Sequence, residues 1–381
     1  MTGPGQKSYI AAADFLRVFA VGVVACFHIW QQSWLDPGFT LWGVHFDLQR
    51  VICRGYMGVD LMLLLSGFLL YLPAARAGRM PETKEFYAKR LWRILPSYLF
   101  AMAVCLVFTF LYGRSPGSAP LWKDLLTHLT FTHTFWRETY VWSSLNAALW
   151  TLAVEMQFYL LFPLLGRAFL KRPWLTAAIM TAFALLCRLV ISPMEDITIL
   201  FNQLPCMLDL YACGMLAAHL LSAREGHGHW LYGVGSALCL GGIVWILYHQ
   251  SPVDSRDLNQ LQMVWRLPLG VLGGTFLWCG GQWSAGLDRV LGNPLTRWCA
   301  SISYNFYIWH QYLAVKLKVW RLPPYATDPP QMYEGRVWQA KYTLLCFVAA
   351  FAAAALVTNL VEKPAYRLRA RLYDESLSTV R

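Results

Sequence analysis

Long apolar runs recur along this chain, and short polar segments separate them. A helix needs about 20 mostly apolar residues to cross the hydrocarbon core of a bilayer. By that measure ten segments are candidates, although Gly and polar residues interrupt the eighth and ninth. They are residues 9–31, 55–73, 91–112, 146–170, 173–192, 204–222, 230–248, 264–281, 298–319 and 341–361. The pattern predicts an all-α fold, a polytopic bundle of about ten transmembrane helices over residues 1–366, with a short basic tail at 367–381.

The composition agrees with a chain that lies in lipid. Of the 381 residues, 57% are hydrophobic and only 14% are charged, which is too little charge to cover a soluble domain of this size. The 18 Trp and 19 Tyr suit membrane interfaces. The net charge of +11 does not indicate nucleic acid as a partner, because the basic residues lie in short segments between apolar runs. We therefore expect a multi-pass integral membrane protein whose partner is the bilayer.

Lysine and arginine also predict the orientation of the chain. They are concentrated in the segments that share a side with the N-terminus, above all residues 76–93 and 363–371. Cytoplasmic segments carry such an excess, so both termini are expected in the cytoplasm. The ten cysteines lie mostly inside apolar runs and have no metal-type spacing, so no metal is expected.

The longest segment expected outside joins the third and fourth spans. Within it Leu121, Leu125 and Leu129 recur at helical spacing, with Trp122 and Trp136 nearby. This pattern predicts a short amphipathic or re-entrant helix at the outer interface. Two roles are open for it: a lid over an acceptor cleft, or a helix that rests on lipid.

Ionisable residues inside a span are costly and are therefore candidates for function. Arg17 and His28 lie in the first span, eleven positions apart, so they face within about 20° of each other and differ by about 16 Å along the axis. Glu155 lies in the half of the fourth span that is expected near His28 in depth. A carboxylate beside an imidazole can orient it for proton transfer, whereas the alternative is a packing salt bridge to an arginine.

The second and third spans carry two further candidates. Ser66 can bond substrate or backbone, and Gly67 after it permits a kink or a close backbone approach, so packing is the favoured role of this segment. Arg90 and Arg93 lie one helical turn apart and suit phosphate oxygens. The topology rule alone also predicts basic residues there.

The last two spans hold the remaining polar groups. Tyr304 and His310 lie in the ninth span, where they line a passage or bond neighbouring helices. Pro364 is expected to end the last span, and Glu362 before it to pair with an inner arginine.

Together these segments resemble the membrane acyltransferase-3 family, in the expected order and over nearly the whole chain. Departures from the family pattern are modest: Met62, Leu63 and Leu64 stand where phenylalanines are frequent, and Met156 where a polar residue is common. The matching motifs are Arg17-x10-His28, Leu65-Ser66-Gly67-Phe68, Arg90-x-x-Arg93-Ile94-x-Pro96, Trp150-Thr151-Leu152-x-x-Glu155, Ser303-Tyr304 through His310, and Glu362-x-Pro364.

The resemblance implies an O-acyltransferase of the bacterial cytoplasmic (inner) membrane. Its donor would be acyl-CoA, most commonly acetyl-CoA, and its acceptor a hydroxyl of a cell-surface glycan or other carbohydrate. His28 would then be the catalytic base and Glu155 its orienting partner. The donor-binding residues would be Arg17, Arg90, Arg93, Ser66, Tyr304 and His310.

Two other functions are open from the sequence. Intramembrane ionisable residues also suit a transporter or membrane sensor for a small anionic solute. The same chemistry could acylate a small-molecule secondary metabolite on the donor's side of the membrane. The acyl group, the acceptor and the oligomeric state, including a homo-oligomer, are left open.

Overall fold

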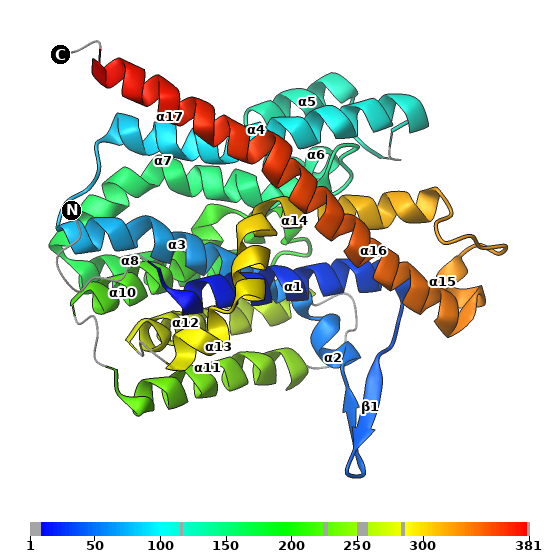
Figure 1. Cartoon of the computed structure of the whole chain (residues 1–381), viewed down its shortest axis with the longest axis horizontal. Helices are drawn as coiled ribbons and strands as arrows, with labels where there is room; N and C mark the ends of the chain where they lie inside the picture. The colour runs from blue at the N-terminus through cyan, green and yellow to red at the C-terminus, as the bar shows by residue number, and fades with distance from the viewer. Residues whose placement is uncertain (1–8, 115–116, 224–227, 250–257, 283–285, 379–381) are drawn as a thin grey trace. The chain divides into compact units, whose positions relative to one another are not determined.

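The computed structural model describes residues 9–114, 117–223, 228–249, 258–282 and 286–378. Nearly all regular structure in these ranges is helical, which confirms the all-α prediction (Figure 1). Each predicted span coincides with a long helix. These are α1 (Ala11–Ser33), α3 (Gly58–Ala77), α4 (Thr83–Tyr112), α7 (Trp150–Lys171), α8 (Pro173–Ile191), α10 (Leu208–Ala223), α11 (Trp230–His249), α12 (Leu258–Gln282), α14 (Pro294–Val319) and α16 (Gly335–Val357).

Eight helical segments among the described residues are long and apolar enough to cross a membrane. The protein is therefore an integral membrane protein. The exceptions among the predicted spans are α12 and α14, where arginines, lysines and polar side chains dilute the apolar run. The count of ten and the cytoplasmic position of both termini stay predictions.

The chain forms two compact units. Unit 1 comprises residues 1–80 and 154–301, and unit 2 comprises residues 81–153 and 302–381. Besides long helices, unit 1 contains the hairpin β1 (Gly38–Leu41) and β2 (Val44–Asp47), the short helices α2 (Gln49–Ile52), α9 (Thr198–Phe201) and α13 (Gly286–Leu291), and the 3-10 turns Gly55–Met57 and Leu204–Met207. Unit 2 contains α5 (Leu121–Leu129), α6 (Arg137–Tyr140), α15 (Pro330–Tyr333) and α17 (Lys363–Ser378), and the turns His133–Phe135 and Ala147–Leu149.

Glycines let the central helices of unit 1 approach closely. A Cβ at Gly214 of α10 would lie 2.0 Å from the carbonyl oxygen of Leu64, and one at Gly67 would lie 2.5 Å from that of Tyr211. The close approach predicted at Gly67 is thus confirmed, and α10 is the helix that makes it. A glycine also allows α1 to pack closely against the start of α3. A Cβ at Gly58 would lie 2.4 Å from the carbonyl oxygen of Ala20.

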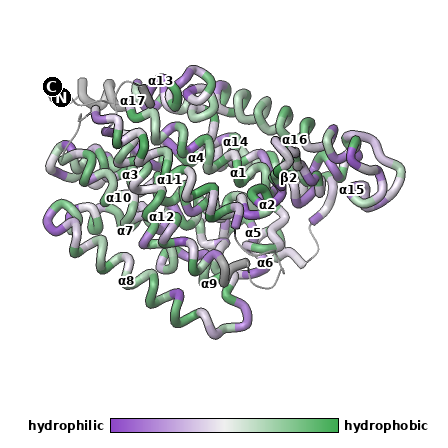
Figure 2. The backbone as a smooth tube through the Cα atoms, turned by 90° about the horizontal axis from the view of Figure 1, so that it is seen from below, coloured by the Kyte–Doolittle hydropathy of each residue, from purple (hydrophilic) through white to green (hydrophobic). Residues whose placement is uncertain are grey.

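The outer helices reverse the pattern of a soluble protein. Large apolar side chains on α8 and α16, such as Leu189 and Leu344, are exposed, whereas α3 and α10 are buried over most of their length. Hydrophobic segments accordingly predominate along the long helices in Figure 2, and hydrophilic ones are frequent near their ends. Lipid is the solvent that suits such a surface.

The C-terminal part of unit 2 corrects one prediction. Pro364 does not end the last helix: α16 passes through a π-helical turn at Thr358–Glu362 into α17. Pro364 is the second residue of α17, where a proline needs no backbone N–H donor. The predicted tail is therefore helical to Ser378, and its residues 379–381 lie outside the described ranges.

The hairpin β1–β2 was not predicted, and it projects from the helices of unit 1 (Figure 1). Its turn residues, Trp42 and Gly43, both have positive φ, as a tight two-residue hairpin turn requires. The paired strands place Phe39 opposite Phe46, with ring centroids 5.2 Å apart.

Candidate active site

Helix α1 carries both candidates that the first motif predicted. Arg17 lies one turn after Asp14, with 3.9 Å between the guanidinium and the carboxylate. His28 lies near the C-terminal end of α1 and is partly exposed, and its ring is 5.2 Å from that of Phe27. A cation with its own counter-ion and an accessible imidazole are thus held on one helix of unit 1.

Glu155 of α7 is the centre of a small hydroxyl network in unit 1. Ser66 of α3 donates a hydrogen bond of 2.9 Å to its Oε1, and Tyr159, one turn further along α7, donates to the same oxygen. Tyr159 is buried, and the neighbouring ring of Phe158 stacks on Tyr211 of α10 at 3.7 Å. The carboxylate is therefore fixed between two hydroxyls inside an apolar bundle.

Ser66 has acquired a definite partner that the sequence did not predict. Gly67, the next residue of α3, packs closely against α10, while the Ser66 hydroxyl reaches Glu155 of α7. The expected link from Glu155 to His28 stays a prediction. The hydrogen bonds described for the carboxylate go to Ser66 and Tyr159.

Unit 2 brings together the basic motif, the ninth-span motif and the closing motif. Arg93 of α4 donates to Glu362 Oε1 at 2.9 Å and to the Tyr366 hydroxyl at 2.9 Å. Asn305 of α14 donates to Glu362 Oε2 at 2.7 Å. The prediction that Glu362 pairs with an arginine is confirmed, and the buried carboxylate joins α4, α14 and the π-helical turn.

Tyr304 belongs to the same cluster. Its hydroxyl donates to the carbonyl oxygen of Ile94 at 3.0 Å, and its ring lies 5.7 Å from the Arg93 guanidinium carbon. Arg90, one turn earlier on α4, lies over the ring of Phe86 at 5.7 Å. Arg93 is thus held by an anion and an aromatic ring, while Arg90 has an aromatic contact.

His310 of α14 is fully buried in unit 2. Its Nδ1 forms a 2.6 Å hydrogen bond with the carbonyl oxygen of Tyr307. Because a carbonyl oxygen only accepts, Nδ1 is the nitrogen that carries the proton. Nearby, Asn146 donates to the carbonyl oxygen of Ile308 at 2.8 Å and caps the turn at Ala147–Leu149.

Sequence reasoning missed a buried charge network in unit 1. Asp60 of α3 accepts from Arg266 Nε at 3.2 Å and from Gln262 at 3.1 Å. Asp209 of α10 accepts from Arg188 Nη2 at 2.6 Å. Both arginines also donate to one backbone acceptor, the carbonyl oxygen at position 206. Charged residues within predicted spans were the available signal, since such groups need partners.

A second missed cluster lies around α5 in unit 2. The rings of His128 and His133 stack at 3.8 Å, and His128 Nδ1 lies 3.2 Å from Asp124 Oδ1. Burial lowers the pKa of His133 well below its usual range, and neighbouring His128 lowers that pKa further. This histidine therefore stays neutral at physiological pH. No set of three or more His, Cys, Asp or Glu side chains among the described residues has a geometry that could hold a metal ion.

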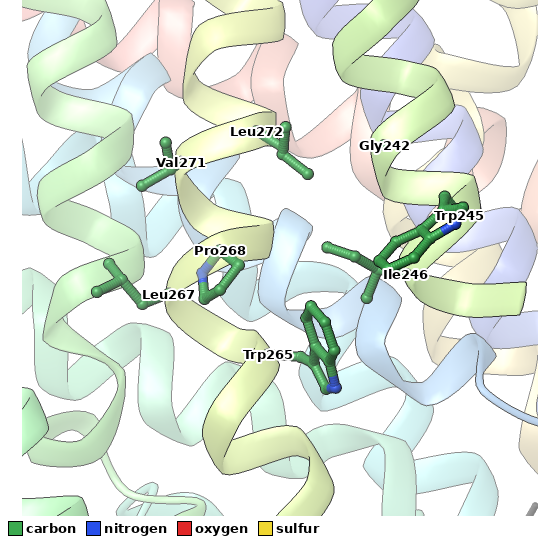
Figure 3. A pocket seen from close by; sticks show the side chains of 8 residues that line it. All are labelled: Gly242, Trp245, Ile246, Trp265, Leu267, Pro268, Val271 and Leu272. Atoms are coloured by element: carbon green, nitrogen blue, oxygen red, sulfur yellow. The ribbon is translucent and has the colours of Figure 1, made fainter. Parts of the chain in front are cut away.

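An apolar pocket of about 550 Å³ lies between α11 and α12 of unit 1 (Figure 3). Trp245 and Ile246 come from α11, and Trp265, Pro268 and Leu272 from α12. None of the described residues that line it has a titratable side chain, so this lining suits a hydrocarbon chain and not acid–base chemistry.

In each unit, carboxylates, hydroxyls and cations are held inside spanning helices, and such costly buried polar groups mark a membrane protein with candidate functional positions inside its helices. The sequence profile of the acyltransferase-3 family, described as an acyltransferase domain, matches residues 10–359, so the chain belongs to this family. The protein is an O-acyltransferase.

Three relatives illustrate the match. ORF330 of Acidianus two-tailed virus, an acetyltransferase by name, is 28% identical over 80% of this chain and 83% of its own length. The exopolysaccharide production protein ExoZ of Rhizobium meliloti is 29% identical over 71% of this chain and 78% of its own. The O-acetyltransferase OatA of Staphylococcus aureus is 29% identical over 43% of this chain but only 26% of its own length. No solved structure matches the chain.

Proposed function

We propose that this protein transfers an acyl group, in the commonest case acetyl, from acyl-CoA to a hydroxyl of a cell-surface polysaccharide in the bacterial cytoplasmic membrane. The family match supports the reaction class, and the names of OatA and ExoZ support acetylation and a polysaccharide. The structural observation that carries the proposal is the fixed carboxylate of Glu155. It lies in the same unit as His28 and is held by two hydroxyl groups.

The proposed reaction needs one base. His28 takes the proton of the acceptor hydroxyl while the hydroxyl oxygen attacks the carbonyl carbon of the thioester. The new C–O ester bond forms, the C–S bond breaks, and the imidazolium returns the proton to the leaving sulfur as CoA–SH. Glu155 acts through the imidazole of His28 and is a positioning residue. The hydrogen bonds from Ser66 and Tyr159 fix the orientation of the Glu155 carboxylate.

The donor's phosphates need cations. Arg17, Arg90 and Arg93 remain the residues we propose for them, because guanidinium groups bind phosphate oxygens in two-pronged geometry. The ion pair with Glu362 fixes the guanidinium of Arg93 in one orientation before any donor arrives. Ser66, Tyr304 and His310 stay proposed as polar groups along the donor's path.

The test is a single substitution in purified protein. His28→Ala, reconstituted in nanodiscs with acetyl-CoA and a polysaccharide acceptor, should lose at least about 10²-fold of the acceptor-dependent thiol release that a general base contributes. His219→Ala on α10 is the matched control, because it removes a histidine from another helix of unit 1 and should leave turnover unchanged.

Binding separates chemistry from folding. Acetyl-CoA should still raise the melting temperature of His28→Ala, whereas loss of that shift would point to misfolding, and unchanged turnover would exclude His28 as the base. Solute flux into liposomes without consumption of acetyl-CoA would instead support a carrier.

A further inference from the structure

The amphipathic helix α5 of unit 2 is oriented opposite to a helix of a water-soluble domain. Three of its polar side chains are buried, and three of its large apolar side chains are exposed. The buried ones are Asp124, Thr127 and His128, which are 0%, 6% and 0% exposed. The exposed ones are Trp122, Leu126 and Leu129, at 69%, 54% and 48%, and they share one helical face at spacings of four and three.

The buried face of α5 has specific partners, so its orientation is determined by the protein. Asp124 accepts hydrogen bonds of 3.1 Å from the Ser143 hydroxyl and 2.9 Å from the backbone N–H of Ser144. His128 stacks on His133, and its backbone oxygen accepts a 2.8 Å hydrogen bond from the Tyr98 hydroxyl. A rotation that hid the leucines would break these contacts.

The surroundings of the exposed face have the composition of a membrane interface. Trp136 and Trp142, which follow α5 in the chain, are both exposed. Lys123 lies 5.4 Å from the ring centre of Trp136, and Arg137 lies 5.3 Å from that of Trp142. Tryptophan rings with adjoining cations are typical of the headgroup region, where the ring is half in hydrocarbon and the cation meets lipid phosphate.

The spanning helix that precedes α5 in the chain also ends in exposed apolar side chains. Phe110, Leu111 and Tyr112 at the C-terminal end of α4 are exposed, and only residues 113–120 separate them from α5. Since that chain segment is short, α5 lies at the same side of the bilayer as the end of α4. A patch of this kind in water would be costly, and it needs a cover.

We propose that α5 lies in the interfacial layer of the leaflet that the C-terminal end of α4 reaches, with Trp122, Leu126 and Leu129 inserted among lipid acyl chains. Lipid is the occupant, because aromatic rings and cations adjoin α5 and because the exposed apolar end of a spanning helix precedes it closely in the chain. A lid over a water-filled cleft would carry the opposite amphipathicity. The proposal does not depend on the acyl-transfer reaction.

The test is the depth of single positions in a bilayer. A fluorescent non-canonical amino acid is encoded at position 126 or 129, which avoids the ten native cysteines. The purified protein is reconstituted in vesicles and quenched by acyl-brominated phosphatidylcholine or by aqueous iodide. Position 111 at the end of α4 is the lipid reference, and position 195, an exposed glutamate between α8 and α9, is the aqueous reference.

We expect brominated lipid to quench positions 126 and 129 within about two-fold of position 111, and iodide to quench them at least about five-fold less than position 195, because an interfacial helix lies about 5–10 Å below the surface. Quenching by iodide like that of position 195 would overturn the proposal. Protection from both quenchers would also overturn it, and loss of that protection on dilution of the protein in lipid would identify a second copy as the cover.

Discussion

A methyl group at Gly214 should separate two central helices of unit 1. Its Cβ would lie 2.0 Å from the carbonyl oxygen of Leu64. An ordinary C···O contact is about 3.3 Å, so α3 and α10 must move apart locally by about 1.3 Å. At Gly67 the same Cβ would lie 2.5 Å from the carbonyl oxygen of Tyr211, which requires a shift of about 0.8 Å.

The expected order of stability follows from these shifts. Overpacking a buried contact costs about 1–3 kcal/mol, and Gly214→Ala should lie at the upper end of that range, with Gly67→Ala below it. Gly241 of α11 is the matched control, because no atom lies within 4 Å of its Cβ position. There the substitution only removes backbone freedom and should contribute about 0.5–1 kcal/mol in favour of the folded state.

Activity should respond more steeply than stability. Ser66 of α3 donates to Glu155, and α3 is the helix that Gly214→Ala displaces. A displacement of about 1 Å in a catalytic arrangement can cost about 10²-fold in rate. Acyl transfer by Gly214→Ala should therefore fall by about that factor at a temperature where the variant is still folded.

The assay is the temperature of half-loss of monodisperse protein, at one heating rate because unfolding of such proteins is often irreversible. Turnover is measured on the same preparations. If Gly214→Ala has the same temperature of half-loss as Gly241→Ala, or if its turnover equals that of wild type, the reasoning from helix separation is wrong.

Three further outcomes are expected. Asp60→Asn leaves the Arg266 guanidinium buried without its anion and should cost about 3–5 kcal/mol of stability. The double variant Asp60→Leu with Arg266→Met should restore much of this loss, because it removes both buried charges. Equal melting temperatures of wild type and Asp60→Asn would contradict this. Ser66→Ala removes a hydrogen bond to the Glu155 carboxylate and should lower turnover in the thiol-release assay about 10–100-fold. Because the pKa of His133 is lowered in the folded protein, the unfolded chain binds a proton at this histidine first as the pH falls. His133 therefore does not affect stability above about pH 6.5, and below that pH it lowers the free energy of unfolding by up to about 1.4 kcal/mol per pH unit. His133→Phe, which keeps a ring beside His128, should abolish this contribution to the pH dependence of the melting curves.

Apolar run length was sufficient to locate the ten long helices that coincide with predicted spans, because lipid requires such runs whatever the tertiary contacts are. It did not locate the polar helix α17. It did not give the helix ends. Residues 83–90 were read as a basic loop, yet α4 begins at Thr83, since the spacing of Phe86 and Arg90 also suits a helix lying at an interface. Pro364 misled for a similar reason: a proline breaks a helix only where its missing N–H is needed, and the π-helical turn before it changes the hydrogen-bond register.

The roles proposed for the candidate site residues stay predictions, and the structure tests only their contacts. Glu362 was expected to pair with an arginine, and it does so with Arg93. The partners of Glu155 could not be predicted, because Ser66 lies 89 positions away and reaches it only through the close approach of two helices. The ion pairs of Asp60 and Asp209 were beyond sequence reading for the same reason: each joins helices whose pairing no local pattern specifies.

The Asp60–Arg266 pair sets a problem of timing during biosynthesis. The two residues are 206 positions apart. A ribosome adds about 5–20 residues per second, so about 10–40 s pass between the emergence of one and of the other. Over that interval the aspartate must stay protonated, hydrated or paired with another cation, because hydrocarbon does not tolerate an isolated carboxylate. Helix α3 is thus expected to wait at the insertion machinery, or near the membrane surface, until α12 arrives.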